Sequence, residues 1–230
     1  PFDNTSTPVG IPVLYVSGVD GNDTNSGGYA SPFKTIGKGI AEATNGCRVV
    51  VNPGIYTGST NKNLSYSGKE LSVVGLVDNT PVVIDCENSG GGFVFNSGEG
   101  TNALLRGISI INGSSSGIAC DNGTPTIHSI VVSNCTGGGL TVEDSEGITV
   151  SDSVFSGNGG FGISVWQHTS NFTLLSSRVV GNLGGGGYFN SPDVHIENCE
   201  FNGNTGWGGF YITSVDGSVV DSKVINNISD

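Results

Sequence analysis

The sequence predicts an all-β fold in which coils of about 23 residues stack into a parallel β-helix. Two observations lead to this prediction. First, an asparagine recurs every 22 to 24 residues, and an apolar residue stands three positions before every copy except the first; the copies are Asn112, Asn134, Asn158, Asn182, Asn204 and Asn227. Second, Val, Ile and Phe alternate with polar residues between these positions, a pattern typical of strands. Repeats built on helices fit this pattern poorly.

The sequence of the N-terminal part indicates an extended arm followed by a helix that caps the first coil. Residues 1–13 contain three prolines and predict an extended arm, and residues 14–230 predict a single β-helix domain. Within that domain we expect one helix over about residues 32–45, with Ser31 as its N-cap and Pro32 at its first position. Such a helix would cover the first coil, whose backbone groups would otherwise lie unpaired.

Two further columns accompany the asparagines. A glycine followed by an apolar residue predicts a tight bend before a buried strand, at Gly117-Ile118, Gly139-Leu140, Gly162-Ile163, Gly187-Tyr188 and Gly209-Phe210. The asparagines themselves predict a structural ladder, in which each side chain bonds to its neighbours one coil above and below. Because a ladder side chain that points inward cannot carry a glycan, this interpretation competes with glycosylation.

The repeats also resemble a known family. Phe155-x-x-Asn158 and Phe201-x-x-Asn204, with Gly-Gly-apolar triplets at residues 138–140, 186–188 and 208–210, resemble the repeats of polymorphic outer membrane proteins and related right-handed β-helix proteins. The segments around Pro32–Ile36 and Val51–Tyr56 are similar to the entry segment of pectin-lyase-like β-helices. The resemblance implies a right-handed β-helix with a short N-terminal capping helix.

Composition and motifs predict a location outside the cell. The net charge of −12 disfavours a nucleic-acid partner, and no apolar run is long enough to predict a membrane span. Met is absent even at position 1, which is consistent with removal of a secretory signal. Asn-x-Ser/Thr sequons predict N-glycans at Asn4, Asn22, Asn63, Asn112, Asn122, Asn134, Asn171 and Asn227. Together these observations predict a secreted or cell-surface glycoprotein.

Cofactor and metal chemistry is not indicated. Five cysteines lack metal-ligand spacing, and Cys120 with Cys135 is the candidate disulfide pair. Asp20, Asn22 and Asp23 suggest either a calcium loop or a hydrogen-bonded turn, and the turn is favoured because the following residues do not match a calcium-loop pattern. We expect no cofactor and no metal.

The sequence favours a structural or adhesive protein over an enzyme. A polysaccharide lyase or hydrolase needs converging carboxylates or a basic residue, whereas the candidates here are scattered, so no catalytic residue is assigned. Asp193, His195 and Glu197 alternate along one strand and are interpreted as a solvated face. The alternative is a carbohydrate-binding or polysaccharide-degrading β-helix. Enzymatic activity is thus left open, with the balance toward none.

Two surfaces are candidates for partners. Trp166, Phe189 and Tyr211 are expected on the outer face of consecutive coils, as an aromatic patch for a carbohydrate ligand or a protein, although a slip of one residue would bury them. The last repeat lacks a capping helix, which predicts head-to-tail self-association into a fibre in which the arm of residues 1–13 reaches a neighbour.

Overall fold

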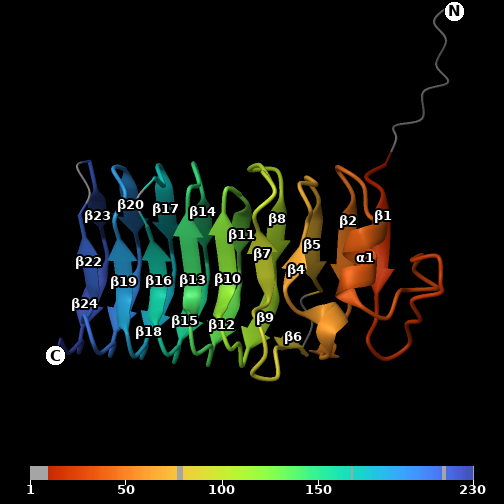
Figure 1. Ribbon diagram of the computed structural model, residues 1–230, viewed down its shortest axis with the longest axis horizontal. Coiled ribbons are helices and arrows are strands. Elements are labelled where there is room, and N and C mark those ends of the chain that lie inside the picture. Colours follow the sequence, from red (N-terminus) through yellow and green to blue (C-terminus); the bar gives the residue numbers. More distant parts are fainter. Residues whose placement is uncertain (1–9, 77–79, 167, 214–215, 230) are drawn as a thin grey trace, which may run out of the picture.

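The computed structural model describes residues 10–76, 80–166, 168–213 and 216–229. These residues form an all-β parallel solenoid, which confirms the predicted fold class. Successive strands of each sheet lie side by side along the long axis of the molecule (Figure 1). The described part of the chain contains no helix that is both long and apolar enough to cross a membrane.

Three sheets form the walls of the solenoid, and the paired strands in each are parallel. The first sheet contains β1 (Val13–Val16), β2 (Arg48–Val51), β5 (Ser72–Gly75), β8 (Leu104–Arg106), β11 (Thr126–His128), β14 (Thr149–Ser151), β17 (Phe172–Leu175), β20 (Val194–Glu197) and β23 (Ser218–Val220). The second contains β3 (Gly54–Tyr56), β6 (Val82–Asp85), β9 (Ile108–Ile111), β12 (Val131–Ser133), β15 (Val154–Ser156), β18 (Arg178–Val180), β21 (Glu200–Asn202) and β24 (Lys223–Ile225). The third contains β4 (Leu64–Ser65), β7 (Phe93–Phe95), β10 (Ser116–Asp121), β13 (Gly138–Glu143), β16 (Phe161–Val165), β19 (Gly185–Phe189) and β22 (Phe210–Ile212).

Alternation along each strand builds the core. Within one coil, Val150, Phe155 and Ile163 point inward from the three sheets and are fully buried. The bend between the first and second sheets places one residue per coil in the left-handed region, at Gly107, Ser129, Asp152, Ser176, Asn198 and Asp221. The bend that follows the second sheet does the same at Asn112, Asn134, Gly157, Gly181, Gly203 and Asn226. Asn, Asp and Gly tolerate this conformation best, which explains their recurrence at these positions.

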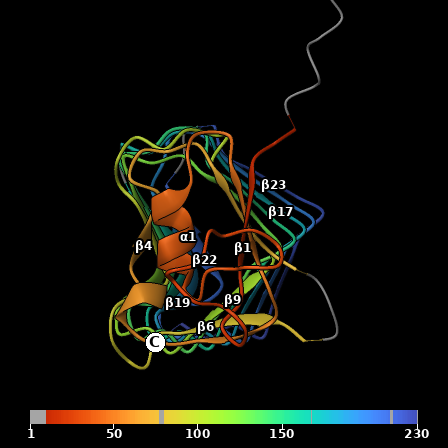
Figure 2. The ribbon, with the colours of Figure 1, turned by 90° about the vertical axis from the view of Figure 1, so that its right-hand side faces the viewer.

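One helix covers the N-terminal end of the solenoid. Helix α1 (Ile36–Glu42) lies across the end of the coil stack when the molecule is viewed along its long axis (Figure 2). Its buried residues include Ile36 and Ile40, and it packs against β1, β2 and β4. Gly39 permits this close approach, because a Cβ at Gly39 would lie 2.8 Å from a methyl group of Val16.

The predicted start of this helix is wrong. Thr35, not Ser31, is the N-cap, and its side chain accepts a hydrogen bond from the Lys38 N–H. Ser31 instead closes a turn by bonding through its backbone to Gly27 and Gly28. Phe33 continues as an extended segment alongside β1, so the chain enters the helix four residues later than the Ser-Pro signal predicted.

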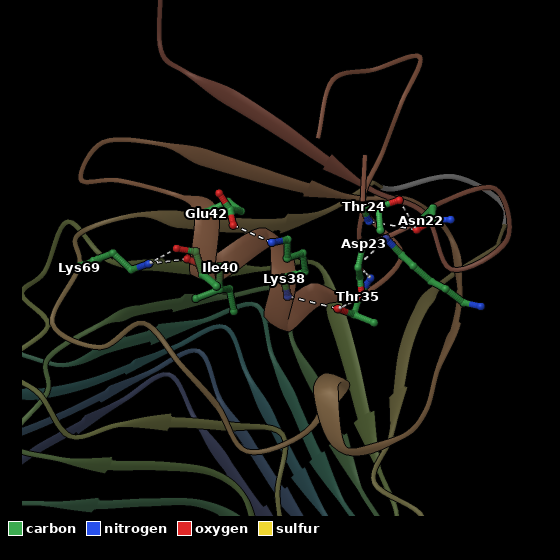
Figure 3. A network of polar contacts seen from close by, with 10 residues as sticks. Asn22, Asp23, Thr24, Thr35, Lys38, Ile40, Glu42 and Lys69 are labelled. Atoms are coloured by element: carbon green, nitrogen blue, oxygen red, sulfur yellow. Dashed lines mark hydrogen bonds and ion pairs between the residues drawn. The ribbon is translucent and has the colours of Figure 1, made fainter. Parts of the chain in front are cut away.

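Side chains from outside the helix satisfy both of its ends (Figure 3). At the N-terminal end, Asp23 Oδ1 accepts from the backbone N–H groups of Lys34 and Thr35, and Oδ2 accepts from Thr35 Oγ1. At the C-terminal end, Lys69 Nζ donates to the carbonyls of Ile40 and Ala43. The Asp23 carboxylate is therefore used by the fold, which supports the turn rather than the calcium loop.

A second short helical segment, the 3₁₀ turn η1 (Ser59–Asn61), ties the cap to the first coils. The side chain of Asn61 is buried, its Oδ1 accepts from the Ile36 N–H at 2.8 Å, and its Nδ2 donates to the Thr57 carbonyl at 2.8 Å. The cap is thus held by specific polar contacts as well as by apolar packing.

An asparagine ladder runs through the later coils. Asn158, Asn182 and Asn204 are fully buried, and Asn227 continues the column. Asn204 Nδ2 donates to Asn227 Oδ1 and to the Val179 carbonyl, both at 2.9 Å, and the Asn204 N–H donates to the same Asn227 oxygen at 2.9 Å. The side chains of Asn182 and Asn204 each make four hydrogen bonds in the interior, to the coil before and to the coil after.

The ladder does not include its first two predicted members. Strand pairing aligns Ser133 with Ser156, which places Cys135 rather than Asn134 opposite Asn158. Cys135 donates its backbone N–H to Asn158 Oδ1 at 3.0 Å. Asn134 is exposed and Asn112 is half-buried, and both occupy the left-handed bend described above. Asparagine thus serves two roles: it forms the left-handed bend at one position and the interior ladder at the next. The spacing in the sequence did not separate the two positions.

The cysteines are core residues. All five are free and buried, so the proposed pairing of Cys120 with Cys135 is wrong. Cys120 faces inward from β10 of the third sheet, whereas Cys135 follows β12 of the second sheet and joins the ladder column. Burial raises the pKa of the Cys86 thiol to about 12 and also raises those of Cys47, Cys135 and Cys199.

Candidate functional site

Five aromatic side chains gather on the outer side of the third sheet, on and beside β16, β19 and β22. We call this cluster the aromatic surface; its members are Phe161, Trp166, Tyr188, Trp207 and Tyr211. Tyr188 lies at its centre, with its ring centroid 4.7 Å from that of Trp166, and 5.7 to 6.3 Å from those of the three other rings. Tyr188 and Tyr211 are stacked, with an angle of 14° between their planes.

Strand register places these rings outside. Ser164, Tyr188 and Tyr211 are partners across β16, β19 and β22, so the three side chains occupy one outward row. Trp207 is 61% exposed, Tyr211 44% and Trp166 38%, while Phe161 and Tyr188 are half-buried by their neighbours. Apolar rings left in water on a sheet that is otherwise well packed mark an interaction surface.

The sequence placed Trp166 and Tyr211 on this face but was wrong about Phe189. Phe189 is fully buried, and Tyr188 takes the outward position. Gly187 is the register partner of Ile163 and Phe210, so it occupies the inward position in its own strand. A Cβ at Gly187 would lie 2.3 Å from Cε2 of Phe189. The Phe189 ring therefore fills the space that a side chain at residue 187 would need.

Sequence reasoning also missed Phe161 and Trp207. Phe161 stands one position and Trp207 two positions before the glycine-apolar pair used to count the register, and both lie next to glycine-rich segments that leave room for rings. A Cβ on Gly185 would lie 2.7 Å from the Phe161 ring and 3.3 Å from Trp207 Cβ, so a bare backbone at residue 185 accommodates both side chains. The feature of the sequence that could have indicated these two residues is a run of glycines flanked by aromatic residues.

Small hydroxyl side chains continue the same face toward the N-terminal end. Ser116 Oγ and Thr141 Oγ1 lie 2.7 Å apart, and Ser164 Oγ donates to Thr141 Oγ1 at 3.2 Å. Asp121 of β10 and Glu143 of β13 are register partners at the edge of this face, and both are exposed. The aromatic surface is therefore bordered by hydroxyl groups and two carboxylates.

Other titratable groups lie in several places, and four of them, Glu99, Asp144, Glu146 and His168, line one pocket at the bend that follows the third sheet. His128, His168 and His195 each lie 3.1 to 3.3 Å from a carboxylate, respectively Asp152, Asp144 and Glu197, at separate places on the surface. His195 also contacts Ser218 Oγ at 2.7 Å. Among the described residues, no group of three or more His, Cys, Asp and Glu side chains has the arrangement of a metal site.

The predicted glycosylation positions differ in accessibility. Asn22, Asn63, Asn122, Asn134 and Asn171 are exposed, and Asn4 lies outside the described residues. Asn112 is half-buried and donates from Nδ2 to Asp85 Oδ1, and Asn227 is half-buried with its Nδ2 bonded to the Phe201 carbonyl. Asn63, Asn112, Asn122, Asn134 and Asn171 all have positive φ, so bends of the backbone also account for asparagine there.

This architecture defines a class. The family model for the right-handed β-helix region matches residues 43–179, more than half of the chain, and the protein belongs to the right-handed β-helix family. No curated protein matches the chain.

Three solved structures with a similar fold are two lyases and a complex with xylose. A rhamnogalacturonan lyase matches with a TM-score of 0.65 and 14% identity, over 92% of this chain and 62% of the lyase. Pectate lyase Pel9A matches with a TM-score of 0.52 and 14% identity, over 95% of this chain and 78% of that one. XylC in complex with xylose matches with a TM-score of 0.52 and 9% identity, over 93% and 64%. The chain thus spans less than two thirds of the length of the first of these proteins, and the likeness concerns the fold.

Proposed function

We infer that this protein is an extracellular adhesive β-helix that binds a carbohydrate chain on the aromatic surface. The observation that carries this proposal is the outward cluster centred on Tyr188, which offers flat apolar faces bordered by hydroxyl and carboxylate groups. Sugar rings have apolar faces that pack on such side chains and hydroxyl groups that need hydrogen-bonding partners. The names of the similar structures agree with a carbohydrate ligand but are only analogies of fold.

Binding to insoluble polysaccharides tests this function. Wild-type protein should co-sediment with at least one plant or microbial polysaccharide, and Tyr188→Ala and Trp166→Ala should lose most of that binding. Tyr29→Ala is the matched control, because Tyr29 is an exposed aromatic, 82% accessible, near the opposite end of the molecule. Loss of binding in the control, or retention in both site variants, would contradict the proposal.

The extracellular location is part of the same proposal. Accessible sequons at Asn22, Asn63, Asn122, Asn134 and Asn171 support N-glycosylation during secretion. Expression behind a secretion signal in a eukaryotic host, followed by peptide mapping, should find glycans on some of these five. Glycan on Asn158, Asn182 or Asn204, which lie in no sequon and are fully buried, is not expected.

A second candidate function, end-to-end self-association, has its own observation. Val219 and Val224 are the register partners of the fully buried Ile196 and Phe201, yet they are 43% and 50% exposed in the last described coil. Burying such side chains, whether under a following coil or against another copy, removes apolar surface from water. Sedimentation over a range of concentrations should then show growing oligomers, and Val219→Asp with Val224→Asp should hold the protein at one size.

A further inference from the structure

Resting on the carbohydrate-binding function above, we propose that the aromatic surface selects uncharged glycans and excludes polyuronates. This inference concerns the charge of the ligand, which stacking on aromatic rings does not by itself determine. It comes from the charged groups that the third sheet contains and from those that it lacks.

The third sheet contains no cation. The strands β4, β7, β10, β13, β16, β19 and β22 contain no Lys or Arg residue. Arg178 pairs with Glu200 on the second sheet, and Lys62, which lines a pocket with Leu64 and Ser65 at the N-terminal end of the third sheet, pairs with Glu87. A polyuronate has one carboxylate per sugar unit, and binding it favourably requires charge-assisted donors that this face does not supply.

The charges that border the face are negative. Asp121 and Glu143 are partners in adjacent coils, so their backbones lie about one strand spacing, ~4.8 Å, apart. Trp166 follows Glu143 in the same outward row, because its N–H bonds to the Val142 carbonyl. A ligand stacked on Trp166 therefore lies about one strand spacing, ~4.8 Å, from Glu143, which is within the Debye length of ~8 Å at physiological ionic strength, and Asp121 lies one further spacing along the same row. A uronate would be repelled there.

The same groups suit a neutral sugar. Ionised carboxylates are strong acceptors for sugar hydroxyl groups, and the half-buried hydroxyls of Ser116 and Thr141 act as donors or acceptors along the face, whereas the Ser164 hydroxyl is buried. An uncharged chain running along the axis of the solenoid would meet the hydroxyl groups and carboxylates in one stretch and the rings in the next. Its binding should depend little on salt, because no ion pair forms.

Calorimetric titration of the intact chain with two soluble probes tests the proposal. One probe is a neutral β-1,4-linked xylose or glucose hexasaccharide, and the other is a galacturonate hexasaccharide. The wild type should bind a neutral probe and should bind the galacturonate at least about tenfold more weakly, which corresponds to ~1.4 kcal/mol. Raising the salt concentration should leave neutral binding unchanged.

A charge-reversal variant gives the sharpest comparison. Asp121→Lys with Glu143→Lys should gain at least about tenfold in galacturonate affinity, since each exposed lysine adds an attraction where there was repulsion. Asp152→Lys, a reversal of an exposed carboxylate on another face, is the matched control and should gain nothing. Circular dichroism of each variant separates loss of folding from change of ligand.

The outcomes are distinguishable. Wild-type protein that binds galacturonate as tightly as the neutral probe, with loss of both in Tyr188→Ala, would overturn the charge selectivity and leave carbohydrate binding standing. Failure of both probes to bind, with no polysaccharide co-sedimenting, would overturn the carbohydrate function itself and the selectivity with it.

Discussion

Asn158 and Asn182 share one hydrogen-bonding oxygen: Asn182 Oδ1 accepts from the backbone N–H of Asn158 at 3.0 Å and from its Nδ2 at 2.9 Å. Asn182 Nδ2 in turn donates to the Phe155 carbonyl at 3.1 Å. All of these groups lie in the interior, where a polar group without a partner costs about 1–3 kcal/mol. The ladder is therefore the polar counterpart of the aliphatic core.

Removing this link should destabilise the solenoid. Asn182→Ala removes the acceptor of the Asn158 N–H and the side-chain donor to the Phe155 carbonyl, and it leaves Asn158 Nδ2 with only its 3.3 Å bond to the Val132 carbonyl, so we expect the free energy of unfolding to fall by about 3 kcal/mol. Urea denaturation followed by circular dichroism measures the change. Asn96→Ala is the control, since Asn96 is exposed and makes only a 3.3 Å contact with Ser97, and it should change stability by less than about 0.5 kcal/mol. Equal effects of the two substitutions would contradict the ladder.

The register of β19 makes opposite predictions for two adjacent residues. Phe189→Ala should cost about 3–5 kcal/mol of stability, because it empties a fully buried site. Tyr188→Ala should cost about 1 kcal/mol or less and should act on ligand binding instead. Thermal unfolding of the two variants compares them directly, and a larger loss of stability for Tyr188→Ala would show that the register is the one predicted from the sequence.

The N-terminal cap should depend on Asp23. Replacing Asp23 by Ala removes the acceptor for Lys34, Thr35 and the Thr35 hydroxyl, so we expect a loss of about 1–2 kcal/mol and faster hydrogen exchange over residues 36–42. Asp20→Ala, in an exposed position of the same loop, should behave like the wild type. If calcium rather than these hydrogen bonds organised the loop, added chelator would lower the stability of the wild type, and we expect no such effect.

Burial should make the five thiols unreactive in the folded protein. With the pKa of Cys86 raised to about 12, the fraction of thiolate at pH 8 is about one in ten thousand, and a thiol reagent should modify none of the five cysteines in the native protein. All five should react after unfolding. Thr136→Cys, which places a thiol at an exposed site beside Cys135, should add one fast-reacting group.

The raised pKa of Cys86 also predicts how the stability of the protein depends on pH. The folded state holds the Cys86 proton more tightly than the unfolded chain, whose pKa is near 9, so this contribution is present below about pH 9 and is lost as pH rises toward 12. Replacing Cys86 by Ser should reduce that dependence on alkaline pH. An unchanged alkaline unfolding curve would contradict the burial effect.

Periodicity predicted the fold because a solenoid repeats its inward residues once per coil. The same periodicity could not fix the register in two places. Cys135 occupies a ladder position while the neighbouring Asn134 occupies the bend, so a count of asparagines shifts by one residue. In β19, three consecutive glycines offer no side chain to mark the inward position, and only packing against Phe189 distinguishes Gly187 from Tyr188.

The sequence predicted that an aromatic patch lies on the outer face, but it did not predict all the residues that form the patch. Trp166 and Tyr211 follow from alternation, whereas Phe161 and Trp207 join the cluster through bare glycine backbone that lets distant rings meet. The helix start failed for a similar reason. Ser31 and Pro32 form a local signal for a helix, but bonding of Phe33 to the backbone of β1 prevails, and the helix begins only after Thr35.

Both tryptophans of the chain, Trp166 and Trp207, belong to the aromatic surface, so tryptophan fluorescence reports on this site alone. A fluorescence titration with the neutral hexasaccharide is therefore the most direct test of carbohydrate binding there. We predict a saturable change of emission in the wild type, and an affinity at least about tenfold weaker in Tyr188→Ala. A glycan that binds by calorimetry without changing the emission, or that binds Tyr188→Ala as tightly as the wild type, would contradict this account.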